Sequence, residues 1–318
     1  MYKSKSVAVI IPSFNEQVNI EKVINSMPEY VDRILVINDC STDKTREIVE
    51  ENIKNNSKIL LINHEKNQGV GATISTGCKW TLENNIDITV GMAGDAQMEP
   101  KDMSNLLDVI IEDKADYVKG NRPRSGDIRH QTPWFRYYGN QILSLLTKVA
   151  SGYWHVADPQ NGYCALNRKV LEKINWSNTY SRYGFYNDLL VKMNIENLRV
   201  KEVSTNAYYN VGEVSGIKVR KFMFTLSALL AKQFLFRLKE KYIVRDFHPL
   251  VFFYLLGGFF GVTTIGLAIR VVYVIIEGGQ IPSINALAAF FSFMSASLFT
   301  LFAMWFDMSY NRELKGSD

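Results

Sequence analysis

The sequence predicts an α/β domain with a mostly parallel sheet, followed by two helices long enough to span a membrane. From the N-terminus, short apolar runs rich in β-branched residues alternate with helical stretches, as in domains built around a parallel sheet. Near the C-terminus, residues 249–269 and 283–306 contain no charged side chain. A helix of about 20 apolar residues crosses the hydrocarbon core of a bilayer. The alternative for these stretches is a pair of buried helices in a soluble protein.

Four strands and three helices can be placed in order along the first domain. Each predicted strand is followed by polar residues, and ligands of parallel sheets bind beyond the carboxyl ends of the strands. These positions, Asn15 with Glu16, Asp39, Asn67 and Asp95, therefore outline a site. The strands are expected at 7–14, 33–39, 58–64 and 87–95, and the helices at 18–27, 45–54 and 71–84.

The composition fits a folded, reduced protein. Hydrophobic residues make up 47% and charged residues 21%, and the net charge of +4 is too mild to indicate nucleic acid. Cys40, Cys78 and Cys164 are widely spaced, which argues against a disulfide framework or a structural zinc site. The apolar run at the N-terminus is too short for a signal peptide, so the first domain is expected to stay in the cytosol.

Four motifs occur in order with characteristic spacing: IPSFNE (11–16), NDCSTDKT (38–45), NQGVGATISTG (67–77) and GDAQM (94–98). With them the chain resembles family 2 glycosyltransferases of the GT-A fold, and among these the polyprenyl-phosphate sugar synthases, over roughly residues 5–210. Carboxylates such as Glu16 and Asp39 can accept hydrogen bonds from a base and ribose. For Asp39 the alternative is a turn residue. The resemblance implies a nucleotide-sugar site made by Pro12, Asn15, Glu16, Asp39, Asn67, Gly71, Asp95, Ala96 and Gln97.

Asp95 is the predicted metal ligand. A nucleotide diphosphate leaving group needs a hard divalent cation, Mg²⁺ or Mn²⁺, and such cations prefer oxygen ligands. The family usually supplies a DxD motif that continues as DxDxQ, but here Ala93 occupies the first Asp position. Asp95 and the carbonyl of Gln97 remain as expected ligands, and Glu99 is an alternative source of the missing carboxylate.

Residues 120–122 (GNR) resemble the glycine-arginine turn that follows the family's fifth strand, and the arginines from this turn onward suit an anionic acceptor. Arg122, in the GNR turn at 120–122, can hold a phosphate through its forked donors. Arg129 and Arg136 lie among aromatic residues, a mixture that suits a lipid phosphate at a membrane surface. The alternative is a loop with solvated charges.

Two later motifs, DPQNGYCALNR (158–168) and YGFYNDLLVKM (183–193), resemble acceptor-side motifs of the family. The resemblance implies that Asp158 lines the sugar site and that Asp188 lies near the acceptor. With Asp95 and Arg122 these form the expected catalytic set.

The expected organisation is a GT-A domain (1–215), a basic juxtamembrane segment (216–246), and a transmembrane hairpin with a short tail (247–318). The hairpin helices are expected at about 249–276 and 283–306, joined by a turn without Lys or Arg. Basic residues dominate 216–246, so the positive-inside rule places both termini in the cytosol. That segment is expected to form an amphipathic helix on the membrane surface. The alternative is a helix packed on the catalytic domain.

These features predict a metal-dependent transfer of one hexose or N-acetylhexosamine from a nucleotide diphosphate sugar to a dolichyl or undecaprenyl phosphate, and the resemblance implies inversion at the anomeric carbon. The reaction is expected at the cytosolic face of the cell membrane. A phosphomonoester has a second pKa of about 6, so it needs no strong base. A first alternative is transfer to a lipid-linked saccharide or polysaccharide, which requires a stronger base. A second, motivated by Ala93, is a degenerate transferase that serves as a scaffold. The resemblance also suggests a homo-oligomer.

Overall fold

The computed structural model describes residues 1–122, 134–206, 219–280 and 282–317. The chain divides into two compact units, Met1–Phe234 with Glu313–Asp318, and Leu235–Arg312. The division falls inside helix α9 (Val219–Lys239), whereas the sequence suggested borders near residues 215 and 246. Each unit is described by itself.

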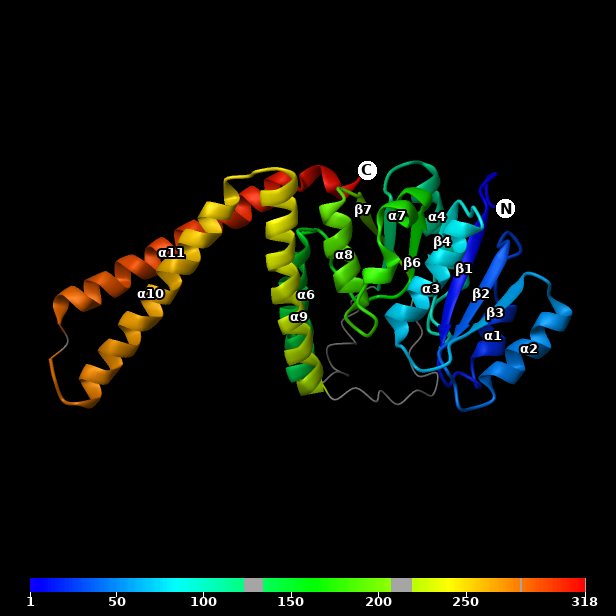
Figure 1. Ribbon diagram of the computed structural model, residues 1–318, viewed down its shortest axis with the longest axis horizontal. Coiled ribbons are helices and arrows are strands. Elements are labelled where there is room, and N and C mark those ends of the chain that lie inside the picture. Colours follow the sequence, from blue (N-terminus) through cyan, green and yellow to red (C-terminus); the bar gives the residue numbers. More distant parts are fainter. Residues whose placement is uncertain (123–133, 207–218, 281, 318) are drawn as a thin grey trace. The chain divides into compact units, whose positions relative to one another are not determined.

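Unit 1 contains a sheet whose described strands have the order β3-β2-β1-β4-β6-β5-β7 (Figure 1). Neighbouring strands are parallel except β6, which is antiparallel to both β4 and β5. The mostly parallel α/β sheet is thereby confirmed. The strands are β1 (Val7–Ser13), β2 (Arg33–Asn38), β3 (Ile59–Asn63), β4 (Ile88–Gly91), β5 (Tyr117–Asn121), β6 (Cys164–Asn167) and β7 (Val200–Ser204).

Helices cover both faces of this sheet, which explains why the central strands are apolar on both sides. On β1, Val7 and Val9 pack with one helical layer, whereas Ala8 and Ile10 pack with the other. The first layer is α1 (Ile20–Asn25), α2 (Thr45–Asn55) and α4 (Met103–Ile111), with the short turn η1 (Pro100–Asp102). The second is α3 (Val70–Glu83), α7 (Arg168–Lys173) and α8 (Phe185–Ile195), with η2 (Trp176–Asn178).

The antiparallel strand β6 determines what reaches the carboxyl edge of the sheet. Its first residue, Cys164, pairs with Gly91 near the end of β4 and with Lys119 of β5. Because β6 begins at that edge, the preceding loop 158–163 lies beside the loop that follows β4 and beside Arg122, the residue that follows β5. This is how a segment far along the chain joins the site.

A third apolar cluster joins α8 to α6 (Trp134–Ser151) and to the first part of α9. Its buried members include Leu143, Val191, Leu226 and Leu230. This part of α9 therefore packs on unit 1. That agrees with the alternative stated for residues 216–246, a helix packed on the catalytic domain. A position on the membrane surface stays a prediction for the rest of that segment.

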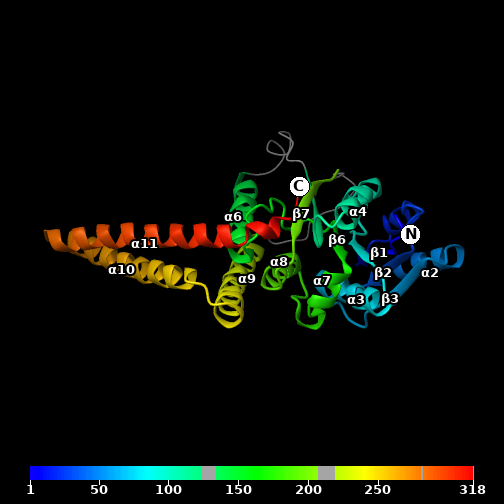
Figure 2. The same ribbon diagram turned by 90° about the horizontal axis from the view of Figure 1, so that it is seen from above.

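Unit 2 consists of the end of α9, the wide turn η3 (Glu240–Arg245), α10 (Leu250–Ile276) and α11 (Ser283–Tyr310). Figures 1 and 2 show α10 and α11 side by side. The rings of Phe260 and Phe299 stack between them at 5.8 Å. The turn η4 (Arg312–Lys315) follows α11, and from Glu313 onward it belongs to unit 1. Both helices are long and apolar enough to cross a membrane, and hardly any residue of their most apolar stretches is buried in the described structure. That exposure contradicts the alternative of buried core helices.

A buried ion pair closes one end of unit 2. Arg237 of α9 donates two hydrogen bonds to Asp307 of α11, at 2.8 and 3.0 Å, and both side chains are fully buried. The hydroxyl of Tyr242 donates to Asp307 at 2.6 Å, and the ammonium of Lys241 donates to Asn311 at 2.8 Å. These contacts fix the end of α9 to the end of the second apolar helix.

Candidate functional site

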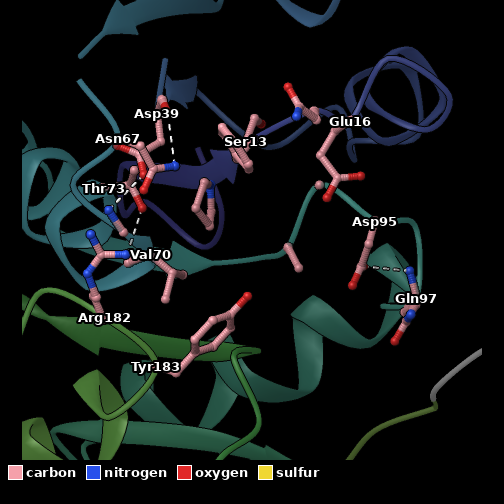
Figure 3. Close-up of a pocket in the computed structure, with 16 residues that line it drawn as sticks. Ser13, Glu16, Asp39, Asn67, Val70, Thr73, Asp95, Gln97, Arg182 and Tyr183 are labelled. Atoms are coloured by element: carbon pink, nitrogen blue, oxygen red, sulfur yellow. Dashed lines mark hydrogen bonds between the residues drawn. The ribbon is translucent and has the colours of Figure 1, made fainter. Parts of the chain in front are cut away.

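A cavity of about 840 Å³ opens where β1, β2 and β4 end (Figure 3). Seven of the nine residues predicted for nucleotide-sugar binding line it. The lining residues are Pro12, Ser13, Phe14, Asn15, Glu16, Asp39, Asn67, Gly69, Val70, Thr73, Ala93, Gly94, Asp95, Gln97, Arg182 and Tyr183. The sequence motifs therefore converge on one cavity at the predicted edge of the sheet.

The loop after β1 is held in a tight turn against the loop after β2. Asn15 has a positive φ of 59°. Its backbone N–H donates to the hydroxyl of Ser41 at 3.0 Å, and its side-chain oxygen accepts from the N–H of Thr42 at 2.9 Å. Glu16 follows directly, and its side chain reaches the cavity.

Asp39 organises the loop after β3 as well as lining the cavity. Its buried carboxylate accepts from the backbone N–H groups of Gln68 and Gly69, at 2.9 and 2.7 Å. It also lies 2.9 Å from Nδ1 of His64, whose Nε2 lies 3.0 Å from the hydroxyl of Thr76. No sequence motif predicts a role for His64, and its position directly after β3 is the one feature of the sequence that points to it.

Gly71 lies outside the cavity lining and serves packing. A Cβ atom there would lie 2.2 Å from the carbonyl oxygen of Tyr180. The N–H of Gly71 donates to the carbonyl of Ser181 at 2.8 Å, so loop 180–183 lies directly on the start of α3. This contact carries Arg182 and Tyr183 to the cavity (Figure 3), and the sequence analysis missed both.

Asp95 lies in a turn after β4. Its carboxylate accepts from the N–H of Gln97 at 3.0 Å, and Ala96 between them has a φ of 58° but does not line the cavity. Burial raises the pKa of Asp95, although the N–H of Gln97 and the charge of Arg122 act against it. Figure 3 shows the Asp95 and Glu16 side chains facing the same part of the cavity.

The residues at the Asp95 end of the cavity suit a metal ion that is coordinated partly by the protein and partly by a bound ligand. Among the described residues, no group of three or more His, Cys, Asp or Glu side chains could hold a cation alone. Asp95 and Gln97 supply oxygen atoms, and Mg²⁺ typically combines one or two carboxylates with substrate phosphates. Glu99 is not part of the lining; its carboxylate accepts from the N–H of Lys101 at 3.4 Å, capping η1.

Arg122 and Asp158 form a forked ion pair beside this end. Two nitrogen atoms of the guanidinium donate to the two carboxylate oxygens, at 2.7 and 3.1 Å. Burial would raise the pKa of Asp158, but the hydrogen bonds and charge of Arg122 outweigh it and hold that pKa below the usual value. Loop 158–163 also contacts the Asp95 turn region, because Tyr163 donates to the carbonyl of Glu99 at 3.1 Å.

Asp188 is buried and does not line the cavity. Its carboxylate accepts from the N–H of Tyr180 at 2.9 Å, from Lys192 at 2.6 Å, and from Gln233 of α9. In the structure it positions the loop that carries Arg182. The predicted acceptor contact Arg129 and the side chain of Arg136 lie outside the described residues.

Comparison with known proteins finds relatives that are similar in sequence over about two thirds of the chain. The chain is 31% identical over 218 residues to the UDP-N-acetylglucosamine–dolichyl-phosphate N-acetylglucosaminyltransferase of Methanococcus voltae, covering 64% of this chain and 86% of that protein. It is 28% identical to the polyprenol monophosphomannose synthase of Mycolicibacterium smegmatis, covering 69% and 84% respectively.

Solved structures support the fold. Glucosyl-3-phosphoglycerate synthase of Mycobacterium tuberculosis, crystallised with Mn²⁺, UDP and glucosyl-3-phosphoglycerate, superposes with a TM-score of 0.52 at 19% identity. The match covers 74% of this chain and 80% of that one. The family model "Glycosyl transferase family 2" matches residues 8–175. The cavity formed by the four motifs, the sheet around it and these relatives together establish that the chain is an enzyme belonging to glycosyltransferase family 2.

Proposed function

We propose that this enzyme transfers one sugar from a nucleotide diphosphate sugar to a polyprenyl phosphate, with inversion at the anomeric carbon. An oxygen of the acceptor phosphate attacks the anomeric carbon, and the bond from that carbon to the diphosphate breaks. The nucleoside diphosphate leaves with the electron pair. The relatives named for dolichyl-phosphate and polyprenol substrates support this acceptor class.

The observation that carries the acceptor assignment is the Arg122–Asp158 pair. An alcohol acceptor needs a general base, which works best with a pKa near the working pH. Asp158 has a lowered pKa and both of its oxygens accept from Arg122, so it is a poor base. A phosphate acceptor is already ionised and requires none. The pair therefore favours a phosphate over the hydroxyl of a lipid-linked saccharide.

In this proposal Arg122 holds the acceptor phosphate. Arginine is suited to this because its planar fork presents several donors at once. Asp158 keeps the guanidinium in a fixed orientation, and Asp188 acts through the loop it positions rather than as a base. Catalysis then rests on positioning and charge stabilisation.

The donor diphosphate is proposed to bind at the Asp95 end of the cavity, with a Mg²⁺ or Mn²⁺ ion held by Asp95 and Gln97. When bound, such an ion offsets the charge of the leaving group. Ala93 leaves this end one carboxylate short of the usual motif. Glu16 is the other carboxylate that lines the same end, and its Cγ would lie 3.5 Å from a Cβ at Gly94. We propose that Glu16 supplies the missing negative charge.

The two apolar helices are proposed to anchor the enzyme in the cell membrane with both termini in the cytosol. The basic residues of 216–246 and the turn without Lys or Arg between the helices support this orientation. A polyprenyl phosphate presents its charged group at that surface. In this proposal the membrane that holds the two helices also presents the phosphate of the acceptor to the enzyme.

The proposal is tested with the full-length protein in detergent, radiolabelled nucleotide sugars and undecaprenyl or dolichyl phosphate. The expected product is an organic-extractable, mild-acid-labile lipid that forms only when the acceptor is added. A saccharide-lipid or polysaccharide that accepts the label while the lipid phosphate does not would overturn the acceptor assignment. Wild-type protein with neither transfer nor donor hydrolysis in the presence of Mn²⁺ would favour a scaffold role.

A further inference from the structure

A buried lysine lies next to the Arg122–Asp158 pair. Lys119, on β5, has no exposed surface. Its ammonium donates to the carbonyl of Asn161 and lies 4.5 Å from the ring centroid of Tyr186. Among the described residues it forms no salt bridge with a carboxylate. The sequence analysis assigned this residue no role.

The contacts around Lys119 lead to the acceptor side of the site. The side-chain amide of Asn161 donates to the carbonyl of Gly120 at 2.7 Å, which ties loop 158–163 back to β5. Glu202 of β7, the register partner of Lys119, accepts from the N–H groups of Ala157 and Asp158, each at 2.9 Å. Lys119 and Glu202 therefore hold two neighbouring parts of the segment that carries Asp158.

The charge of Lys119 is sensitive to its surroundings. Burial lowers the pKa of Lys119 to about 8, while Cys164, Asp158 and Glu202 raise it and Arg122 lowers it. With the ring of Tyr186, these are the groups that face the ammonium. At neutral pH Lys119 is mainly protonated, and it loses its charge as the pH rises past about 8.

Stability alone does not explain such a residue. A buried cation without a carboxylate partner is costly, and an apolar side chain of similar size is often neutral or stabilising at such a position. Buried ionisable groups with shifted pKa values are frequent where a site must bind or transform a charged ligand. The ligand expected beside Arg122 carries negative charge.

We propose that Lys119 is a positioning residue for the acceptor phosphate. It holds loop 158–163 through Asn161 and places a second positive charge behind Arg122, so that the anionic acceptor binds against two cations. This inference rests on the proposed phosphate acceptor. It adds a residue, outside the cavity lining, that determines acceptor affinity.

The test compares Lys119→Met and Lys119→Gln with Lys58→Met. Methionine removes both charge and donor, and glutamine keeps an N–H donor without the charge. Lys58 is a matched control, because it also donates to a backbone carbonyl, that of Glu29, but from the exposed amino end of β3. Calorimetry measures binding of farnesyl phosphate, a short soluble acceptor, and of UDP to the full-length protein in detergent between pH 6.5 and 9.

Both Lys119 variants are expected to bind farnesyl phosphate about tenfold more weakly at pH 7, the scale of one lost charge interaction in a partly screened site. UDP binding and the melting temperature should stay near wild-type values. Wild-type affinity for farnesyl phosphate should fall above pH 8, whereas the variants should show no such fall. Above pH 8 the phosphate is already almost completely doubly ionised, because its second pKa is about 6, so a fall in affinity there reports on the protein.

Four results would overturn the inference. Three concern the variants: wild-type affinity in Lys119→Met, wild-type behaviour in Lys119→Gln, or a large loss of melting temperature in both variants. The second would reduce Lys119 to a hydrogen-bond donor, and the third to a structural residue. Wild-type protein that fails to bind farnesyl phosphate would also overturn it. Protein that binds farnesyl phosphate with the expected Lys119 dependence but does not transfer sugar to polyprenyl phosphate would contradict the proposed reaction alone.

Discussion

Replacing Asp307 by leucine should destabilise the helical hairpin strongly. In the wild-type protein the carboxylate accepts two hydrogen bonds from Arg237, at 2.8 and 3.0 Å, and neither side chain is exposed. Asp307→Leu leaves the guanidinium buried without its counter-charge, a change that typically costs about 3–5 kcal/mol. Replacing both residues, as Arg237→Met with Asp307→Leu, removes both charges together. The double variant should lie within about 1 kcal/mol of the wild type, because paired charges can be exchanged for apolar side chains at little net cost.

Thermal unfolding in detergent, followed by tryptophan fluorescence, measures this effect, since Trp305 lies in the same unit. Met308→Leu, at an exposed position next to Asp307, is the matched control and should melt like the wild type. An unchanged melting temperature in Asp307→Leu would refute the idea that the pair stabilises the hairpin. A double variant as unstable as the single one would show that the loss came from repacking rather than from an unpaired charge.

Three further predictions concern unit 1. Asp95→Asn should weaken Mn²⁺ binding in the presence of UDP by at least about tenfold, because one charged ligand is lost. Calorimetry or the Mn²⁺ electron-spin signal measures this affinity. Equal Mn²⁺ affinity in the variant and the wild type would remove Asp95 from the metal site. Asp39→Asn should lower UDP affinity and cost about 1–3 kcal/mol of stability, because the new asparagine's NH₂ group would face the N–H donors of loop 67–69. Wild-type UDP affinity and wild-type stability in this variant would contradict the role of Asp39 in holding that loop. Asp116, buried against Arg199, has its pKa lowered to about 2 by hydrogen bonds that outweigh the effect of burial. The ionised carboxylate should therefore add about 2 kcal/mol to the free energy of unfolding above pH 4, and this contribution should be lost as the pH falls toward 2. Urea unfolding should show a less stable Asp116→Asn variant at pH 7 and equal stabilities of variant and wild type at low pH.

The sequence predicted the parallel part of the sheet because its strands are continuous β-branched runs with polar ends. Strand β6 gave no comparable signal. It covers only Cys164–Asn167, and its antiparallel pairing depends on β4 and β5, which are distant in the sequence. The place of loop 158–163 at the carboxyl edge therefore followed from tertiary structure alone.

The site was predictable where one strand end supplies one side chain, as for Glu16, Asp39 and Asp95. It was not predictable where a residue acts through packing. Gly71 was expected at the ligand but makes room for the carbonyl of Tyr180, and that contact brings Arg182 to the cavity. Such roles depend on distances between loops, which residue spacing along one chain does not encode.

The structure also changed the interpretation of the acidic residues. From the sequence, Asp158 and Asp188 were both candidates for a catalytic role. One is bound to Arg122 and the other is buried among Tyr180, Lys192 and Gln233, so neither has the environment of a general base. This strengthens the argument for an acceptor that needs no deprotonation.

The central claim is that a single sugar passes to a polyprenyl phosphate. Mass spectrometry of the lipid extract, after incubation of the full-length protein with a nucleotide sugar and undecaprenyl phosphate, tests it most directly. The account predicts a lipid that carries one sugar and one phosphate, formed in equal amount with the released nucleoside diphosphate. A lipid with two phosphates, a product with several sugars, or an unchanged lipid beside an active enzyme would contradict it.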